Sequence, residues 1–370
     1  MTAKKLTFIF VLFLCTLFSV SCLWAADASP TPSMKTVPRE EKLGKRVSES
    51  IEKQVARVTD PDREARLNMI VQKLTPYLER PLNYNIRILE LKEPNAFSLP
   101  GGQMYITTGM LDFLKSESEY AAVIAHELIH ADRAHGIVQS ARNNRLSMLT
   151  IAGMIAAAAA GAPEAMVMAS AIQTAAINSY SIDLEKEADA KGIDVLTKGG
   201  YNPAAMLTMI ERFKVLRMRR AYYDPGIFQT HPDDDERAEA AVRYMKDKGI
   251  QIQRKDVLNA LILTVEEQSG DIRLKVDGAT MLALPDGPEN RKFMNDFTAR
   301  LDDALEMELA PYDIQVHGEG ANQALIMKGK FVLREEERPA ELPGLPEIRD
   351  RIVSAIQSAR RGNPLTDYYQ

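Results

Sequence analysis

"VIAHELIH" (residues 123–130) places His126 and His130 four positions apart, with Glu127 directly after the first histidine. Side chains four apart on an α-helix lie on one face, so both imidazoles can reach one metal ion at about 2.0–2.1 Å. Glu127 can accept a proton from a water bound to that ion. The chain has five histidines, and random placement gives on the order of 0.005 H-E-x-x-H matches in such a chain. The segment predicts a helix with a catalytic zinc site, one ion per chain.

Two histidines are too few for this site, because a catalytic zinc ion has three protein ligands and one open position. The segment "SYSIDLEKEADA" (residues 179–190) supplies Glu185 and Asp189, four apart on a second expected helix. One carboxylate can bind the metal, and the other can accept a hydrogen bond from a ligand histidine and fix its tautomer. Next to H-E-x-x-H, this spacing favours Glu185 as a ligand over a solvated helix glutamate.

Two other histidines need an interpretation. His231, in "THPDDDER", precedes Arg237 by six residues, and it could place a donor over the developing oxyanion. It could also be a fourth zinc ligand that closes the site when no substrate is bound, or a histidine in an ordinary turn. His135 is expected about half a helix turn away from the metal-facing side, so we predict a structural capping role for it.

The composition bounds the class of protein. Of the 370 residues, 45% are hydrophobic and 26% charged, which is ordinary for a well-cored protein with one medium domain and a smaller one. The formal net charge of −5 gives no basic excess, so we expect no nucleic-acid partner.

The N-terminus is typical of an exported protein. Residues 1–26 combine two lysines, an uncharged apolar run and small residues, the layout of a secretory signal. The run is nearly long enough to be an uncleaved membrane anchor. Cys15 and Cys22 both lie in this segment, so the mature chain has no disulfide, and Cys22 raises lipidation as an alternative to ordinary cleavage. We predict a periplasmic protein, with membrane association through the N-terminus as the alternative.

The pattern of apolar residues predicts a mainly α (α+β) protein whose larger domain is helical with a small edge sheet. Residues 27–39 form a tether and residues 40–248 the larger domain, which carries the predicted zinc site. The motif helix is expected to begin at a capping box of Ser116 and Glu119 and to end near Gly136. Helices are also expected over residues 40–58, 62–78, 183–197 and 231–249, and from residue 203 into "RMRRAYY" (217–223). A strand is expected over 84–89, and two extended pieces within 95–111 are hinged at 100–102.

Two regions leave alternatives open. Residues 146–160 and 164–178 are Ala-rich helices broken by "GAP"; they suggest a membrane hairpin, but each is too short to cross a bilayer, and close helix packing is favoured. Residues 249–370 alternate like strands around a helix at 289–305. They predict a smaller C-terminal α+β domain of unknown role, without a 34-residue helical repeat.

The segments "NAFSLPGGQMYITTGML", "EYAAVIAHELIHADRAH" and "SYSIDLEKEADAKG" occur in this order in the chain. Their order resembles that of a gluzincin family of zinc metallopeptidases that contains HtpX, the CAAX prenyl proteases and periplasmic proteases of the BepA and LoiP kind. The resemblance covers residues 40–246, and the export signal makes the chain look most like the BepA/LoiP branch. No resemblance guides the reading of residues beyond about 249.

The resemblance implies a role for each matching residue. It implies that His126, His130 and Glu185 are the zinc ligands, Glu127 the general base, Asp189 the partner of a ligand histidine, and His231 and Arg237 the catalytic donors. It also implies that an edge strand pairs with extended substrate. Ile182 stands where many relatives have Arg, which removes a charge next to the third ligand. The residues matched to the substrate edge strand are Asn95, Ala96, Phe97, Gly101 and Gly102.

The function implied is an exported zinc endopeptidase that hydrolyses unfolded or misassembled envelope proteins as protein quality control. Residues 249–370 are the candidate contact for envelope assembly partners. The alternative is a chaperone or assembly factor that holds such clients in the cleft and rarely cuts. A Glu127→Gln variant separates the two, because only a protease would lose its function.

Overall fold

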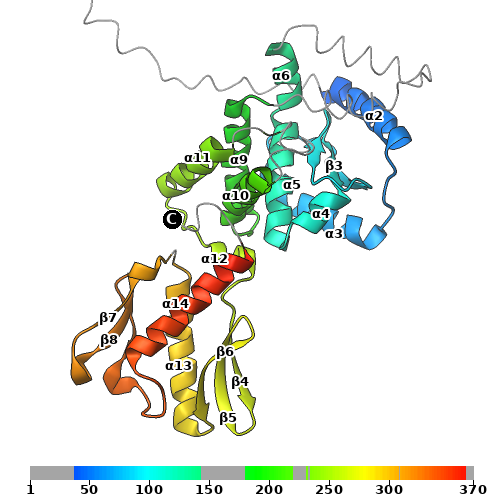
Figure 1. The fold of residues 1–370 in the computed structure, drawn as a ribbon. Helices are drawn as coiled ribbons and strands as arrows, with labels where there is room; N and C mark the ends of the chain where they lie inside the picture. The colour runs from blue at the N-terminus through cyan, green and yellow to red at the C-terminus, as the bar shows by residue number, and fades with distance from the viewer. Residues whose placement is uncertain (1–36, 143–179, 220–230, 232–233, 308, 364–370) are drawn as a thin grey trace, which may run out of the picture. The chain divides into compact units, whose positions relative to one another are not determined.

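The computed structural model describes residues 37–142, 180–219, 231, 234–307 and 309–363 (Figure 1). The predicted signal and the Ala-rich segment at 146–178 lie outside these residues. The described part is mainly helical with three small three-stranded sheets, which confirms the predicted α+β class. None of its helices is long and apolar enough to span a membrane.

The first sheet borders the motif helix. Its strands are β1 (Asn85–Leu89), β2 (Ala96–Ser98) and β3 (Gln103–Thr107) in the order β1-β3-β2, with β1 parallel and β2 antiparallel to β3. The turn between β2 and β3 needs glycine, since Gly101 has φ +86° and a Cβ there would lie 2.6 Å from Glu41 Cα. Because of this close approach, α2 (Val37–Gln54) packs against the turn. In the strand order β1-β3-β2, β2 lies at one edge of the sheet.

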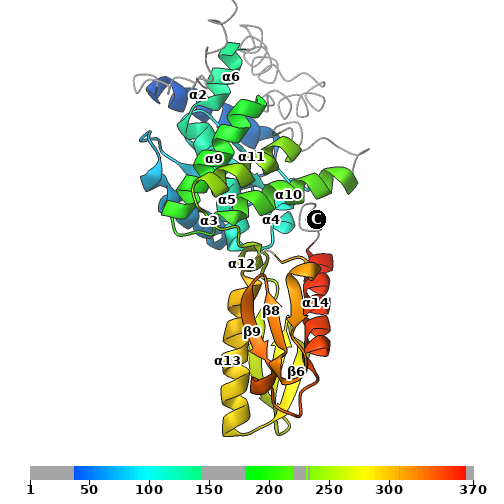
Figure 2. The same ribbon diagram turned by 90° about the vertical axis from the view of Figure 1, so that its left-hand side faces the viewer.

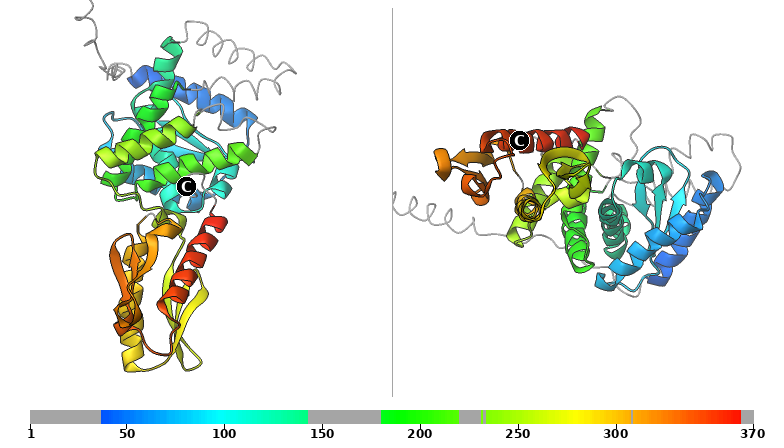
Figure 3. Two further views of the ribbon diagram at one scale, coloured as in Figure 1. Left: turned by 60° about the vertical axis from the view of Figure 1, so that its left-hand side comes forward. Right: turned by 90° about the horizontal axis from the view of Figure 1, so that it is seen from below.

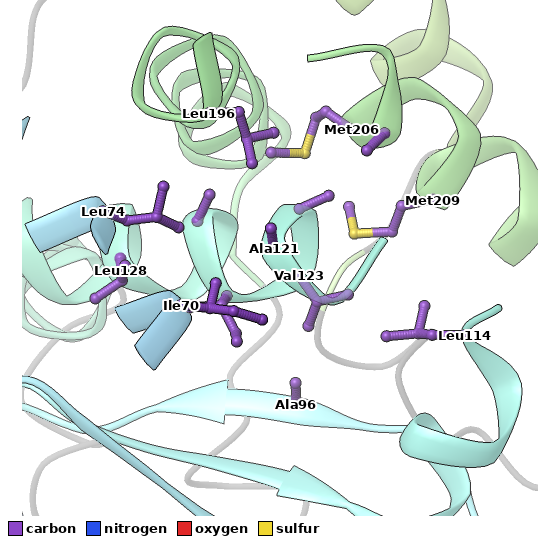
Figure 4. Packing of buried hydrophobic residues seen from close by; sticks show 14 of the residues in the cluster. Ile70, Leu74, Ala96, Leu114, Ala121, Val123, Leu128, Leu196, Met206 and Met209 are labelled. Carbon is purple, nitrogen blue, oxygen red and sulfur yellow. The ribbon is translucent and has the colours of Figure 1, made fainter. Parts of the chain in front are cut away.

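The motif helix α5 (Glu117–Asp132) lies at the centre of the first hydrophobic core. It is buried on all faces from Ala121 to Asp132, as expected of a helix with no solvated side. Figure 4 shows it between Ala96 of the sheet and the side chains of Leu196, Met206 and Met209. These come from α9 (Ile182–Lys198) and α10 (Ala204–Arg219), while α3 (Pro61–Leu74) contributes Ile70 and Leu74.

A glycine allows α9 to approach α5 closely beside the first histidine of the motif. A Cβ on Gly192 would lie 2.5 Å from Met206 Cε and 3.7 Å from the backbone nitrogen of His126. Gly192 is one turn beyond Asp189 and two turns beyond Glu185, so all three share the face that α9 presents to α5. The small residue therefore helps to bring both carboxylates to the motif.

Both ends of α5 differ from the predicted capping. At the start, Ser116 Oγ accepts the Glu119 N–H at 3.2 Å, as predicted, but the Glu119 carboxylate accepts from the Lys115 N–H at 2.8 Å. At the other end, the prediction that α5 ends near Gly136 is wrong. The helix ends at Asp132, Ala134 takes a left-handed φ of +50°, and a new helix α6 (His135–Arg142) begins.

The other predicted elements of this part are confirmed within a few residues. The helix expected over residues 62–78 is α3 followed by a 3₁₀ turn (Thr75–Tyr77), and α9 stops at Gly199. The short helix α4 (Thr108–Phe113), capped by the Thr107 hydroxyl, was not predicted because six residues carry too little periodicity. The charged helix is α11 (Asp234–Asp247).

A second hydrophobic cluster occupies the C-terminal part. This part contains two three-stranded sheets, β4-β5-β6 and β7-β8-β9, whose bounds are given below. Helix α13 (Pro288–Leu305) contacts strands of both sheets, and α14 (Leu345–Gly362) contacts β7 (Ile314–His317) and β8 (Ala324–Met327) (Figure 2). The red helix α14 runs beside the orange strands in Figure 3. Along the chain, the first hydrophobic cluster extends to Val257 and the second begins at Leu258, both within α12 (Arg254–Leu258). The predicted domain boundary at residue 248 stays a prediction. The strands are β4 (Leu263–Gln268), β5 (Asp271–Val276), β6 (Ala279–Pro285), β7 (Ile314–His317), β8 (Ala324–Met327) and β9 (Lys330–Arg334).

Candidate metal centre

Helices α5 and α9 bring two histidines and a carboxylate together. His126 Nε2 lies 2.9 Å from His130 Nε2, and each of these nitrogens lies 3.4 Å from an oxygen of Glu185. All three side chains are at most 4% exposed. The helical spacing predicted from the sequence therefore converges three donor atoms on one point.

His231 joins this group from outside both helices. Its Nδ1 lies 3.2 Å from His126 Nε2 and 3.0 Å from both oxygens of Glu185. One donor atom from each of the four residues lies within 4.8 Å of the others, so the group could hold a metal ion. Neighbouring donors around a tetrahedral zinc ion are about 3.3–3.4 Å apart. Three of these spacings are 3.2–3.4 Å and the other three are 2.9–3.0 Å.

Asp189 fixes the orientation of the first histidine. Its Oδ1 lies 2.9 Å from His126 Nδ1, so the carboxylate holds a proton on Nδ1 and Nε2 faces the other donors. Burial by itself lowers the pKa of His126, but the hydrogen bonds to Asp189 and Glu185 outweigh it and raise that pKa to about 9. Metal ligation needs the neutral ring, so binding of a cation is coupled to release of a proton.

Arg237 supplies the positive charge beside the acidic residues of α9. Its Nη1 lies 3.0 Å from Glu185 Oε2, and its Nε and Nη2 each donate to Asp189 at 2.8 Å. Burial alone would raise the pKa of Glu185, but His231 and Arg237 hold that pKa well below its ordinary range.

Glu127 lies beside the donor group and not within it. Its Oε1 lies 3.4 Å from His231 Nε2, and its side chain is 3% exposed. Its Oε2 is buried and has no hydrogen-bond partner among the described residues. A buried carboxylate oxygen without a protein partner is suited to accept a hydrogen bond from a water or a substrate group.

Two residues near His130 were not predicted to be part of the site. The ring of Tyr180 stacks on His130 with centroids 3.9 Å apart and planes 14° from parallel. His135 Nδ1 lies 2.9 Å from His130 Nδ1, although a continuous helix would have turned it away. The break at Ala134 redirects it, and no sequence signal marks that break.

The predicted substrate strand divides into an edge and a buried part. Phe97 lies on β2, which pairs only with β3 among the described strands. Asn95 and Ala96 are buried, and Gly101 and Gly102 form the turn against α2 and the loop before β1. Their part in binding substrate stays a prediction. The residues that follow Phe97 lie near the donor group: a small cavity is lined by Ser98, Leu99 and Pro100 together with His130 and Tyr180.

Comparison with known proteins agrees with this geometry. The sequence pattern of peptidase family M48 matches residues 61–245, which is half of the chain. The beta-barrel assembly-enhancing protease of Escherichia coli O157:H7 is 26% identical over 232 residues, covering 59% of this chain and 47% of that protein. Metalloprotease LoiP of Escherichia coli K12 is 29% identical over 175 residues, covering 46% of this chain and 66% of LoiP.

A eukaryotic protein shares the same region. The mitochondrial metalloendopeptidase OMA1 of Schizosaccharomyces pombe is 25% identical over 177 residues, 47% of this chain and 50% of that protein. The chain spans less than half the length of the beta-barrel assembly-enhancing proteases that it matches. The family match contains the whole H-E-x-x-H motif, the downstream glutamate and His231. The chain therefore belongs to peptidase family M48, a family of metalloproteases.

Proposed function

We propose that this chain is an exported zinc-dependent endopeptidase that hydrolyses peptide bonds of unfolded or misassembled envelope proteins. The observation that carries the proposal is the buried group of His126, His130, Glu185 and His231, with Glu127 beside it. Imidazole nitrogens with one carboxylate favour zinc over calcium or magnesium, which prefer oxygen ligands. The donor spacings of 2.9–3.4 Å support one ion per chain.

The chemistry divides between the ion and the protein. Zinc, when bound, supplies a Lewis acid that polarises the scissile carbonyl and lowers the pKa of water. Glu127 takes the proton of the attacking water on its free Oε2 and delivers it to the leaving amine. This carboxylate is buried, with 3% of its side chain exposed, which limits the access of other water to the transfer.

His231 has two candidate roles, and its contacts favour one. Its Nδ1 lies 3.2 Å from His126 Nε2 and 3.0 Å from Glu185 Oε1, which favours a fourth ligand that closes the site in the absence of substrate. On substrate entry the ring would leave the donor group. Donation from its Nε2, which lies beside Glu127, to the oxyanion is the other candidate role. Arg237 lies behind Glu185 and Asp189, so we propose that it positions these carboxylates and does not contact the oxyanion.

The substrate class follows from the edge strand. Among the described strands β2 pairs on one side only, so its other edge can add an extended peptide as a further strand. Such pairing requires an unfolded or flexible target. The names of the relatives, beta-barrel assembly-enhancing protease among them, support envelope proteins as the targets. Residues 1–26 would direct the chain to the periplasm, and residues 249–370 would contact assembly partners.

One experiment tests the proposal. Zinc content by elemental analysis and cleavage of unfolded casein are measured for the native chain and for Glu127→Gln, both purified without metal-chelating tags. We expect one zinc per chain in both, with cleavage in the native form and a loss of at least about 10²–10⁴-fold in the variant. A chain without zinc contradicts the assigned ligands.

The same experiment separates the protease from a client-holding protein. Zinc in both forms with no cleavage in either favours the chaperone or assembly factor, whose binding of unfolded casein would survive Glu127→Gln. Cleavage that is equal in both forms contradicts the role of Glu127 as the general base.

A further inference from the structure

His130 has a polar partner on the side of its ring that faces away from the donor group. Its Nε2 points to His126 and Glu185, whereas its Nδ1 lies 2.9 Å from His135 Nδ1. Both rings are buried, with His135 and His130 at most 1% exposed. A contact of 2.9 Å between two imidazole nitrogens requires one of them to donate and the other to accept.

The direction of this hydrogen bond follows from the role of Nε2. A neutral imidazole that offers the Nε2 lone pair to a metal carries its proton on Nδ1. His130 must therefore donate from Nδ1, and His135 must accept at Nδ1. The proton of a neutral His135 then lies on Nε2. Glu187 Oε2 is 3.6 Å from this atom, which is an electrostatic contact longer than a hydrogen bond.

Glu187 is suited to hold His135 in this tautomer. It lies on α9 two residues after Glu185, so it faces away from the donor group and toward the start of α6. Its other oxygen lies 3.6 Å from Arg133 Nε. The carboxylate is therefore flanked by a cation and by the N–H of His135, and both interactions favour its ionised form.

We infer that His135 is a positioning residue: it accepts the Nδ1 proton of His130, is held by Glu187, and so makes His130 present Nε2 to the metal. The inference rests on the proposed function, because it assigns the support of one zinc ligand. The two ligand histidines would then have matched supports. Asp189 accepts from His126, and the His135–Glu187 pair accepts from His130.

The test measures zinc affinity of the full chain by competition with a chromophoric chelator. His135→Leu removes the acceptor and keeps an apolar side chain of similar size, whereas His135→Asn keeps a polar atom near the position of Nδ1. Loss of such an outer partner weakens metal affinity by about 10–100-fold. We expect a loss of this size for His135→Leu, most of it restored in His135→Asn, and a smaller loss for Glu187→Gln.

A second readout reports the hydrogen bond itself. Proton NMR of the zinc-bound chain is expected to show a hydrogen-bonded, slowly exchanging Nδ1 proton of His130 in the native form and to lose it in His135→Leu. A purely structural role would lower the melting temperature without this change. The exposed His317→Leu is the matched control and should bind zinc as the native chain does.

Two results overturn the inference while leaving the proposed function intact. One is a zinc affinity equal to that of the native chain in both His135→Leu and Glu187→Gln. Glu187 is partly exposed, so Glu187→Gln is expected to fold even if His135→Leu does not. The other is an equal loss in His135→Leu and His135→Asn, which would mean that only the shape of the imidazole matters. Absence of zinc from the native chain would instead overturn the proposed function itself.

Discussion

Arg237 and Glu185 form a buried ion pair, with Nη1 and Oε2 3.0 Å apart and both side chains at most 1% exposed. The same guanidinium donates twice to Asp189. One residue of α11 thus fixes both carboxylates that α9 presents to the histidines of α5. The arrangement ties the stability of the helical core to the geometry of the candidate metal centre.

Removal of this guanidinium is expected to destabilise the fold and the site together. Arg237→Gln leaves two buried carboxylates without their counter-charge, which costs about 3–5 kcal/mol in the free energy of unfolding. Arg237→Lys keeps the charge but not the bidentate geometry, so it should cost less. Urea unfolding gives the free energies, and elemental analysis gives the zinc content.

The control for this prediction lies on the same helix. Arg243→Gln breaks an exposed pair with Glu239 and is expected to change stability by less than about 1 kcal/mol. If Arg237→Gln unfolded at the same urea concentration as the native chain, the buried ion pair would contribute nothing to stability.

The parts of the site that could be predicted are those encoded within single helices. His126 and His130 share a face because they are four apart, and Glu185 and Asp189 do so for the same reason. The hinge at Gly101 could also be predicted, because a left-handed turn against another helix tolerates only glycine. Periodicity and backbone sterics act locally, so they can be read from the sequence.

The parts that could not be predicted depend on where separate elements meet. His135 was placed on a continuation of the motif helix, and the unpredicted break at Ala134 brought it to His130. Arg237 was expected to contact the oxyanion, which stays a prediction, and its contacts with Glu185 and Asp189 had no signal in the sequence. Neither contact has a spacing rule, because the partners come from different helices or from the two sides of a break.

Removal of His231 is expected to open the site and not to empty it. His231→Ala leaves His126, His130 and Glu185 as three ligands, which is sufficient for a catalytic zinc ion. We expect one zinc per chain and a higher kcat/KM for unfolded casein, since no protein group then competes with substrate. Zinc content and initial cleavage rates measure this, with the exposed His317→Ala as the control. A lower kcat at unchanged zinc content would assign His231 to the oxyanion instead.

Metal removal is expected to lower thermal stability reversibly. A ligand that binds only the folded state stabilises it by about 2.7 kcal/mol at a concentration 100 times its Kd. The melting temperature should fall with a chelator and rise again as zinc is added. Glu127→Gln should keep the whole zinc-dependent shift, because Glu127 is beside the donor group, whereas His130→Ala should lose most of it. A melting temperature that does not change with zinc would contradict a site built into the core.

The left-handed residue that ends α5 offers a test of the fold at the site. Ala134 has φ +50°, a conformation that costs an L-residue roughly 1–2 kcal/mol and glycine much less. Ala134→Gly is therefore expected to raise the free energy of unfolding by up to about 1 kcal/mol and to keep zinc affinity, since the turn that places His135 remains. Ala134→Val adds a β-branched side chain at the same φ and should destabilise the chain and weaken zinc binding. Urea unfolding and chelator competition measure both effects. Equal stability of the two variants would show that residue 134 does not require the left-handed conformation in solution.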